Sequence, residues 1–351
     1  MQIALDAMGG EQAPHATVEG AVMAARSHDA RVILVGDEER IYSELEKHDT
    51  SGLSLSVYHA PYVVGMHESP SLAIRQNRDS SIKVALGLVK EGEADAVVSA
   101  GNSGAAMAFA MFILKKLEGV ERPAIATVHP TPTGVSILVD AGGNVDCKPV
   151  HLIQFAIMGS VYAKLLLGKE TPRVGLLSNG AEEGKGNELT RESHAILKRT
   201  GLNYAGYVEG RDIYNGNADV VVCDGFVGNV ALKISEGLAD AIGTILRDEI
   251  EKSLRAKLGY LLIKGAFANM EKRVDYSEYG GAPLLGINGI CLISHGNSSA
   301  KAVMNAVLLG VKLAERGFNQ LLEEELEERR ELLKVGHVTK ILEQIRGKII
   351  H

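Results

Sequence analysis

Tryptophan is absent from this chain of 351 residues, and aromatic residues make up only 5% of it. A surface that stacks nucleic-acid bases needs aromatic side chains, and their scarcity argues against such a surface. Positive charge is not in excess either, since 37 Lys and Arg residues stand against 44 Asp and Glu, for a formal net charge of −7. We therefore expect no nucleic-acid partner.

Cysteine and long apolar runs are also scarce. The three cysteines, Cys147, Cys223 and Cys291, are widely separated, which fits neither a disulfide framework nor a metal knuckle and is typical of a reducing compartment. The longest apolar run, residues 105–114, has ten residues, about half of what a membrane-spanning helix needs. The N-terminus lacks the basic and apolar regions of a signal peptide. We expect a cytoplasmic protein without a metal site.

Glycine, in contrast, is abundant, with 39 residues. Short runs of Val, Ile and Leu end in turns rich in Gly, Asp and Asn, and a segment with helical periodicity follows. These runs are 3–5, 31–35, 96–98, 135–139, 174–177, 220–222 and 290–293. The alternation predicts an α/β fold with a mostly parallel sheet covered on both faces. Ligands bind at the carboxyl ends of such strands, so we expect the seven turns to converge on one crevice.

Apolar residues spaced three and four apart predict the helices of this fold. The predicted ranges are 15–27, 81–91, 105–117, 149–167, 187–200 and 229–255. We predict one α/β domain over residues 1–317, from which residues 246–275 protrude as an amphipathic helical segment. Residues 318–351 begin with a dense run of Glu and Arg, which predicts a charged, solvated helical tail.

The stretch from Gly180 to Gly186 resembles a phosphate-binding P-loop without being one. It is one residue short between its glycines, and Gly186 stands where Ser or Thr would bind magnesium. Nucleotide binding is therefore disfavoured, and we expect no cofactor. A Lys beside Gly-rich backbone at a helix N-terminus still makes a good anion site. A plain turn with a solvated Lys185 is the alternative.

No nucleophile stands next to an obvious base. Cys147 and His151 lie four residues apart, but a buried structural cysteine is the simpler interpretation. The turns are instead rich in Asn, whose amide can donate to an oxyanion without titrating. Asn also caps helices, and Asn229 opens a predicted helix, so capping alone would explain it. The residues indicate an anion-binding crevice with amide donors, which suits a reaction in which the anion itself attacks.

Longer motifs run in order through residues 1–315. They include IALDAMGG at 3–10, SAGNSGA at 99–105, DAGGNVD at 140–146, KGNEL at 185–189, CDGFVGNV at 223–230 and SHG at 294–296. On these motifs the chain resembles the phosphate acyltransferase family of bacterial phospholipid synthesis. The resemblance implies a Rossmann-like three-layer α/β/α fold, as in phosphotransacetylases and isocitrate-dehydrogenase-like enzymes. It also implies a homodimer that uses neither a metal nor a nucleotide.

The activity that the resemblance implies is formation of acyl-phosphate from long-chain acyl-[acyl-carrier protein] and inorganic phosphate. It makes Lys185, in KGNEL, and Asn229, in DGFVGN, the catalytic residues. The residues expected to bind phosphate or substrate are Gly9, Gly10, Asn102, Ser103, Gly104, Asn144, Gly186, Asn187 and His295. The stretch Ser178-Asn179-Gly180-Ala181, just before Lys185, departs from the family pattern. We therefore make no assignment of phosphate contacts to these four residues.

Phosphate is already an anionic nucleophile, so we expect direct attack on the thioester without a covalent enzyme intermediate. Lys185 would neutralise the phosphate, and Asn229 would donate to the oxyanion. Two alternatives stay open, namely a phosphotransacetylase that acts on short acyl-CoA and a non-catalytic acyl-binding scaffold.

Two basic segments predict what surrounds the enzyme. Arg75, Arg78 and Lys83 would dock the acidic carrier protein, unless they form a plain solvated helix face. Residues 251–273 carry six basic and two acidic residues, with Leu254, Leu258, Leu261 and Leu262 at helical spacing. A basic amphipathic element is typical of a membrane surface, where the downstream membrane acyltransferase of this family's pathway works. The alternative is that these leucines pack in the core or a dimer interface.

Overall fold

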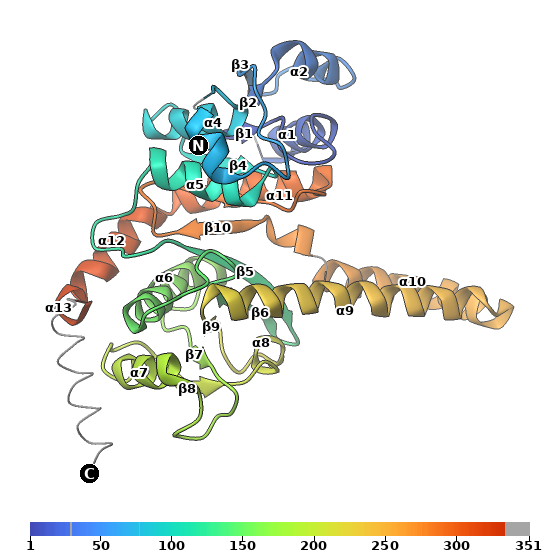
Figure 1. Cartoon of the computed structure of the whole chain (residues 1–351). Coiled ribbons are helices and arrows are strands. Elements are labelled where there is room, and N and C mark those ends of the chain that lie inside the picture. The colour runs from blue at the N-terminus through green and yellow to red at the C-terminus, as the bar shows by residue number, and fades with distance from the viewer. Residues whose placement is uncertain (29, 77, 275, 334–351) are drawn as a thin grey trace.

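A single 11-stranded sheet runs through the computed structural model, which describes residues 1–28, 30–76, 78–274 and 276–333 (Figure 1). The strand order is β3-β2-β1-β4-β11-β10-β5-β6-β9-β7-β8. The strands are β1 (Gln2–Asp6), β2 (Arg31–Gly36), β3 (Leu55–His59), β4 (Ala96–Ser99), β5 (Ala124–Thr131), β6 (Gly134–Val139), β7 (Val174–Leu177), β8 (Tyr204–Val208), β9 (Val220–Val222), β10 (Ala282–Leu285) and β11 (Cys291–Ile293).

The sheet consists of two parallel sets joined by antiparallel strands. One set holds β3, β2, β1, β4 and β11, and the other holds β6, β9, β7 and β8. Between them the pairs β11–β10, β10–β5 and β5–β6 are all antiparallel. The predicted α/β fold is confirmed. The two sets run in opposite directions along the sheet, so the seven turns divide into two groups instead of sharing one edge.

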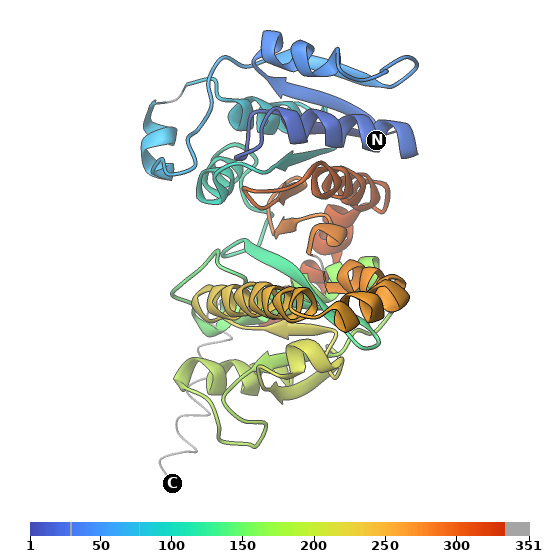
Figure 2. The same ribbon diagram turned by 90° about the vertical axis from the view of Figure 1, so that its right-hand side faces the viewer.

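Helices cover both faces of the sheet (Figure 2). They are α1 (His15–His28), α2 (Glu38–Leu45), α3 (Pro70–Gln76), α4 (Ser81–Lys90), α5 (Ser103–Ile113), α6 (Pro149–Leu167), α7 (Glu188–Leu197), α8 (Asp212–Asn215), α9 (Gly225–Glu251), α10 (Leu254–Val274), α11 (Ala300–Glu315), α12 (Phe318–Glu328) and α13 (Arg330–Leu333). Every predicted helix is present, with ends shifted by at most four residues. The predicted start at Asn229 is wrong, because Asp224 caps the helix by accepting a hydrogen bond from the backbone N–H of Val227 at 2.9 Å.

The core centres on α6, which is apolar on nearly all sides. Among the described residues α6 is the one helix long and apolar enough to cross a membrane by length and composition, but 78% of that window is buried inside the fold, as in a core helix. Helix α12 packs against α6 through buried Phe318, Leu322 and Leu326. This part of the expected solvated tail therefore belongs to the core. The rest of that tail, residues 334–351, lies outside the described residues.

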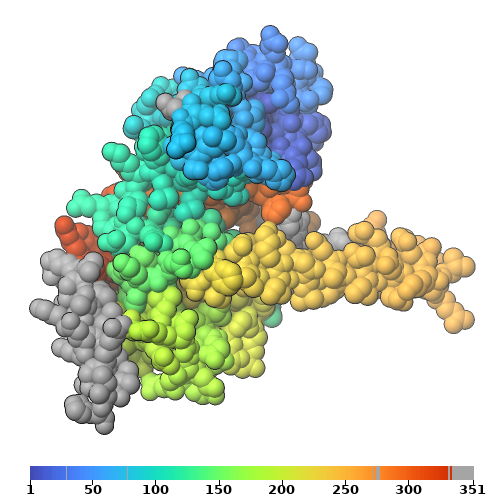
Figure 3. Space-filling view, in the orientation of Figure 1, coloured from blue at the N-terminus to red at the C-terminus, as the bar shows by residue number. Residues whose placement is uncertain are grey.

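Helices α9 and α10 form a hairpin that extends far from the sheet (Figures 1 and 3). The hairpin begins at Gly225 and includes nearly all of the predicted protruding segment 246–275. At its base, the Arg273 guanidinium donates a hydrogen bond to the carbonyl oxygen of Pro132 at 2.9 Å. Large apolar side chains are exposed along α9 and at the start of α10, among them Ile234, Leu254 and Leu262.

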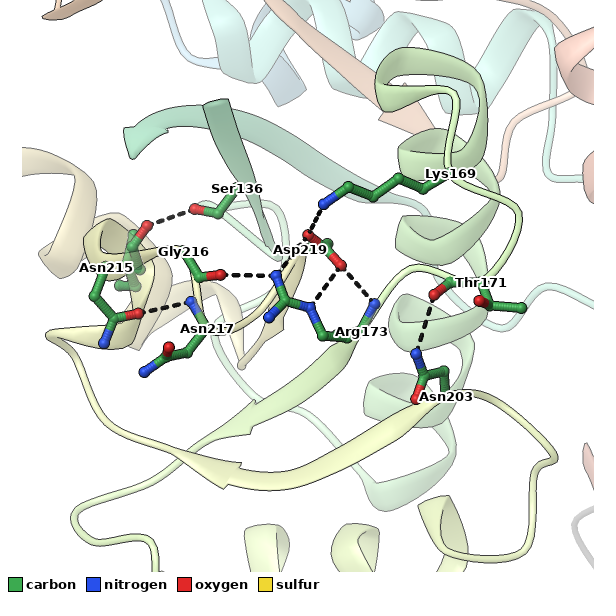
Figure 4. A network of polar contacts seen from close by, with 10 residues as sticks. Ser136, Lys169, Thr171, Arg173, Asn203, Asn215, Gly216, Asn217 and Asp219 are labelled. Carbon is green, nitrogen blue, oxygen red and sulfur yellow. Dashed lines mark hydrogen bonds and ion pairs between the residues drawn. The ribbon is translucent and has the colours of Figure 1, made fainter. Parts of the chain in front are cut away.

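A buried carboxylate fixes the loop that leads into β7. Asp219, whose side chain is 4% exposed, accepts hydrogen bonds from Lys169 Nζ at 2.6 Å and from the backbone N–H of Arg173 at 2.8 Å (Figure 4). The Arg173 guanidinium adds two more and also reaches the carbonyl oxygen of Gly216. Burial alone would raise the pKa of Asp219, but these donors outweigh it and hold that pKa at about 2.

Candidate active site

The turns after β1, β4 and β11 pack together at the N-terminal half of the sheet. A Cβ built on Gly10 would lie 3.1 Å from the carbonyl oxygen of Gly296, and one on Gly9 would lie 2.8 Å from the backbone nitrogen of Gly101. The backbone N–H of Glu11 donates to the Gly296 carbonyl at 2.7 Å. Gly9 and Gly10 are therefore needed for close backbone approach, and they lie beside the turn that carries His295.

Asn102 has a structural role at the start of α5. Its side-chain oxygen accepts from the backbone N–H of Ala105 at 3.0 Å, and its amide nitrogen donates to three carbonyls, among them that of Glu68 at 2.8 Å. Ser103 and Gly104 are exposed at the same helix terminus, where backbone N–H groups favour anions. Met107, one turn further on, approaches Gly143 and so joins the N-terminal group of turns to the C-terminal group.

Asp140 organises the turn after β6. Its carboxylate is fully buried and accepts from the backbone N–H groups of Ile125 at 2.9 Å and Gly143 at 3.0 Å. It also accepts from the side chain of Asn144 at 2.8 Å, and the Asn144 amide donates to the carbonyl of Pro123 as well. Burial raises the pKa of Asp140, against the opposing effect of these hydrogen bonds. Asn144 therefore supports the turn from behind instead of facing the crevice.

The start of α9 lies directly on this turn. A Cβ built on Gly228 would lie only 1.9 Å from the carbonyl oxygen of Asp140, and one on Gly225 would lie 2.7 Å from backbone atoms of Asn144. This close approach brings exposed Asn229 against the turn, with its Oδ1 atom 3.4 Å from a Cβ built on Gly142. Since Asp224 caps the helix, capping does not explain Asn229.

Lys185 lies in the exposed loop between β7 and α7. The side-chain oxygen of Asn179 accepts from the backbone N–H of Gly186 at 2.8 Å, which closes the loop. Gly186 has φ +88°, and a Cβ there would lie 2.1 Å from Thr190 Oγ1, so only glycine fits. Asn187 caps α7 by accepting from the backbone N–H of Thr190 at 2.9 Å. The loop thus holds exposed Lys185 in a defined turn at a helix N-terminus.

One pocket, with a volume of about 640 Å³, joins the Lys185 loop to the start of α9. Gly186 and Asn187 line it from the loop, and Asp224 and Val230 line it from α9 on either side of Asn229. The two motifs that carry Lys185 and Asn229 therefore flank the same cavity. Six other expected binding residues lie away from this pocket, in the turns after β1, β4 and β11: Gly9, Gly10, Asn102, Ser103, Gly104 and His295.

Cys147 and His151 do not form a nucleophile–base pair. Burial, with the carboxylates of Asp140 and Asp224 nearby, raises the pKa of the Cys147 thiol to about 12. The Nδ1 atom of His151 accepts from the backbone N–H of Lys148 at 3.0 Å, and burial lowers the pKa of His151 to about 4. Cys147 is partly buried, and a thiol with so high a pKa is a poor nucleophile, which favours the simpler structural interpretation. Among the described residues, no cluster of three or more His, Cys, Asp or Glu side chains could hold a metal ion.

Sequence reasoning overlooked the two buried aspartates behind the turns. Asp6 ends β1 and accepts from Ser99 Oγ at 2.6 Å, and burial raises its pKa. Asp140 has the same place after β6. The signal that could have found them is a shared pattern, because each is followed by Ala and, shortly after, by two adjacent glycines.

Known proteins resemble this chain over most of its length. Residues 1–321 match the model of a family described as "Fatty acid synthesis protein". The chain is 59% identical over 327 residues to the phosphate acyltransferase of Geobacter sulfurreducens, covering 93% of this chain and 94% of the relative. It is 60% identical over 328 residues to the phosphate acyltransferase of Geotalea uraniireducens, covering 93% and 95%.

Solved structures share the fold at much lower identity. A phosphotransacetylase from Streptococcus pyogenes superposes with a TM-score of 0.63 at 17% identity, covering 90% of this chain and 94% of that one. The EutD phosphotransacetylase from Staphylococcus aureus gives 0.59 at 18% identity, with the same coverage. At this identity the likeness shows a common fold alone.

Proposed function

The chain belongs to the phosphate acyltransferase family, and from that premise we propose that it makes acyl-phosphate from long-chain acyl-[acyl-carrier protein] and inorganic phosphate. The family supports acyl transfer with phosphate in fatty acid and phospholipid synthesis. The observation that carries the finer proposal is the pocket between the Lys185 loop and the start of α9, which is lined by polar residues of that loop and by apolar residues of α9. An acyl thioester with its carbonyl beside the loop and its chain beside α9 matches that lining.

In the proposed reaction, a phosphate oxygen attacks the thioester carbonyl carbon. A carbon–oxygen bond forms, and the carbonyl oxygen becomes an oxyanion. When the oxyanion collapses, the carbon–sulfur bond breaks, and the sulfur leaves with the electron pair and takes up a proton. A thiol pKa near ~8.5 makes that departure undemanding without a strong acid. Lys185 neutralises the phosphate, and the Asn229 amide donates to the oxyanion.

Direct attack is supported by the chemistry of the cysteine nearest the pocket. Cys223 lines the cavity, and burial, together with the carboxylates of Asp224 and Asp140, raises the pKa of its thiol well above the ordinary value. A thiol held neutral is a poor nucleophile. Phosphate, in contrast, carries its negative charge at neutral pH without activation.

The test is release of free thiol, followed with palmitoyl-[acyl-carrier protein] and with acetyl-CoA, each with and without phosphate. We expect phosphate-dependent release that is much faster with the long-chain donor. Faster release from acetyl-CoA would favour a phosphotransacetylase on short acyl-CoA. No release from either donor, with binding of the acyl protein unaffected by Lys185→Ala, would favour a non-catalytic scaffold.

A homodimer through the helical hairpin is the second part of the proposal. Leu238, Ile242 and Ile245 of α9 are each more than half exposed. Their spacing of three or four residues places them on one side of the helix, and a second copy of the chain would cover that side. Light scattering should give about twice the 37.4 kDa of one chain. A Leu238→Glu, Ile242→Glu variant should be monomeric, and a wild-type monomer would refute the dimer.

Membrane contact is assigned to the far end of the hairpin. Leu254 is 80% exposed and Leu262 is 88% exposed, with Arg255 and Lys257 beside them. An anionic leaflet attracts such basic residues by about 1 kcal/mol each. Wild-type protein should sediment with anionic liposomes, and a Leu258→Glu, Leu262→Glu variant should lose binding while keeping activity on soluble substrate. Equal sedimentation of both proteins would refute the membrane contact.

The carrier protein is proposed to dock near α3 and α4. Arg78 lies over the ring of Tyr62, 5.2 Å from its centroid, and Lys83 pairs with Asp79 at 3.0 Å. Arg75 ends α3 on the same part of the chain. At low salt, Arg78→Glu should raise the KM for the acidic carrier protein, and an unchanged KM would place the dock elsewhere.

A further inference from the structure

We propose that the pocket between the Lys185 loop and α9 is the acyl-chain subsite and that Ala231 forms part of the wall that the acyl chain contacts. The inference rests on the proposed function, because it names where that function's acyl group lies. Its volume of about 640 Å³ is in the range of pockets that enclose small organic ligands.

The pocket has a polar side and an apolar side. Ser178, Asn179 and Thr190 line it on the side of the Lys185 loop. Leu177, Ile213 and Ala231 line it elsewhere and offer no polar side-chain atom. The polar side suits the reacting carbonyl and phosphate, and the apolar side suits methylene groups.

Helix α9 supplies the apolar wall as one continuous face. Val227, Val230, Ala231 and Ile234 follow the spacing i, i+3, i+4, i+7, so they lie on the same side of the helix. Val230 and Ile234 are 42% and 64% exposed. Covering them with a hydrocarbon chain removes apolar surface from water, which a polar ligand would not do.

The pantetheine arm of the carrier protein fits this apolar side less well than the acyl chain does. Its amides and hydroxyl would each need a hydrogen-bond partner once they are buried. The charged residue in the pocket lining, Asp224, already accepts from the backbone N–H of Val227 as the helix cap. The arm is therefore assigned to the polar side of the pocket, and the hydrocarbon to the apolar side.

The subsite predicts a graded dependence on chain length. Each methylene group that becomes fully buried contributes about 0.8 kcal/mol, which is about a fourfold gain in kcat/KM. The gain should continue with each added carbon until the chain end has passed the apolar lining of the pocket. A site that holds only the carbonyl would show no such series.

The experiment compares Ala231→Phe with Ala239→Phe on donors with 4, 8, 12 and 16 carbons. Ala239 is an exposed alanine on the same helix and does not line the pocket. Ala231→Phe should lower the ratio of kcat/KM for 16 carbons to kcat/KM for 4 carbons at least tenfold, and Ala239→Phe should leave it unchanged. Because the ratio is internal to each variant, a general loss of activity cancels. An unchanged ratio in a folded Ala231→Phe protein would overturn the subsite.

Two further measurements make every outcome decisive. If Ala231→Phe does not fold, a substitution at the exposed residue Ile234 replaces it. Ile234→Gln should lower the ratio of kcat/KM for 16 carbons to kcat/KM for 4 carbons several-fold, and an unchanged ratio refutes the subsite. Binding of the fluorescent fatty acid cis-parinaric acid should weaken in Ala231→Phe and not in Ala239→Phe. A wild-type protein that binds this probe there but transfers no acyl group would refute the proposed function and retain the subsite. If the wild-type protein is active and its variants keep the same dependence on chain length, the proposed function is retained and the subsite is refuted.

Discussion

Replacing Gly228 with alanine should reduce activity far more than it reduces stability. A Cβ at this position would lie 1.9 Å from the carbonyl oxygen of Asp140, 2.9 Å from its carbonyl carbon and 3.1 Å from the Cys223 sulfur. Ordinary van der Waals contact begins at 3.4 Å, so the start of α9 must retreat by about 1.5 Å (3.4 minus 1.9). Both neighbours of the new methyl are backbone or buried, and neither can rotate away.

The retreat acts directly on the next residue, Asn229. A misplacement of about 1 Å can cost about 10²-fold in rate when a donor must meet a developing charge. We therefore expect kcat to fall about 100-fold for Gly228→Ala. Overpacking of this kind costs about 1–3 kcal/mol in the free energy of unfolding, which leaves most molecules of an ordinarily stable protein folded.

The assay is phosphate-dependent thiol release, measured together with urea unfolding of the same preparation. Gly237→Ala is the matched control, because it lies on the same helix and a Cβ there meets nothing within 4 Å. That control should keep its activity and gain about 0.5–1 kcal/mol of stability, since alanine is the better helix former. If folded Gly228→Ala retains wild-type kcat, the close approach of α9 to Asp140 does not position Asn229 for catalysis.

Three other changes test separate parts of the account. Asn229→Ala should lower kcat by about 10²–10³ while leaving the circular dichroism unchanged, and near-normal turnover would remove Asn229 from the oxyanion site. Lys185→Ala should raise the KM for phosphate with Lys185→Arg restoring part of it, and equal phosphate saturation curves for all three proteins would contradict the assigned role. Stability to urea should fall as pH drops from about 6.5 to about 4, where unfolded His129 and His151 bind a proton but their buried folded forms, with pKa values of about 4, do not. It should fall again from about 4 to about 2, where Asp219 binds a proton in the unfolded chain but stays ionised in the fold, since its folded pKa is about 2; a urea midpoint constant from pH 7 to 3 would contradict both.

Local patterns in the sequence predict most of the secondary structure because they act over one or two turns. The range 149–167 matches α6 at both ends, since a Pro at its start and a Gly after its end mark the boundaries. The sequence places the start of α9 four residues too late, because Gly225 and Gly228 are typical of a loop. In the structure both glycines belong to the first turn of the helix, which Asp224 caps. Their reason for being glycine is close packing against Asp140 and Asn144, which no local pattern reveals.

Tertiary packing decided the features that the sequence did not predict. The charged segment after residue 317 reads as solvated, but every fourth residue from Phe318 to Leu326 is buried against α6. Strand direction reverses through three antiparallel pairs, of which the β10–β5 pair joins residues far apart in the chain, so the single crevice expected from parallel strands became two groups of turns. For the site, residue type predicts amide donors, and only the structure shows how three of these side chains are used. The amide nitrogens of Asn102 and Asn144 donate to backbone carbonyls, and the side-chain oxygen of Asn187 caps α7.

Direct attack by phosphate is the central claim, and a single-turnover experiment with excess enzyme tests it most directly. Enzyme is mixed with long-chain acyl-[acyl-carrier protein] in phosphate-free buffer, free thiol is measured, and phosphate is then added. We expect no thiol above the uncatalysed rate before phosphate is added, and afterwards thiol and acyl-phosphate in equal amounts. A burst of thiol equal to the donor, with the acyl group held covalently on the protein before any phosphate is present, would contradict it.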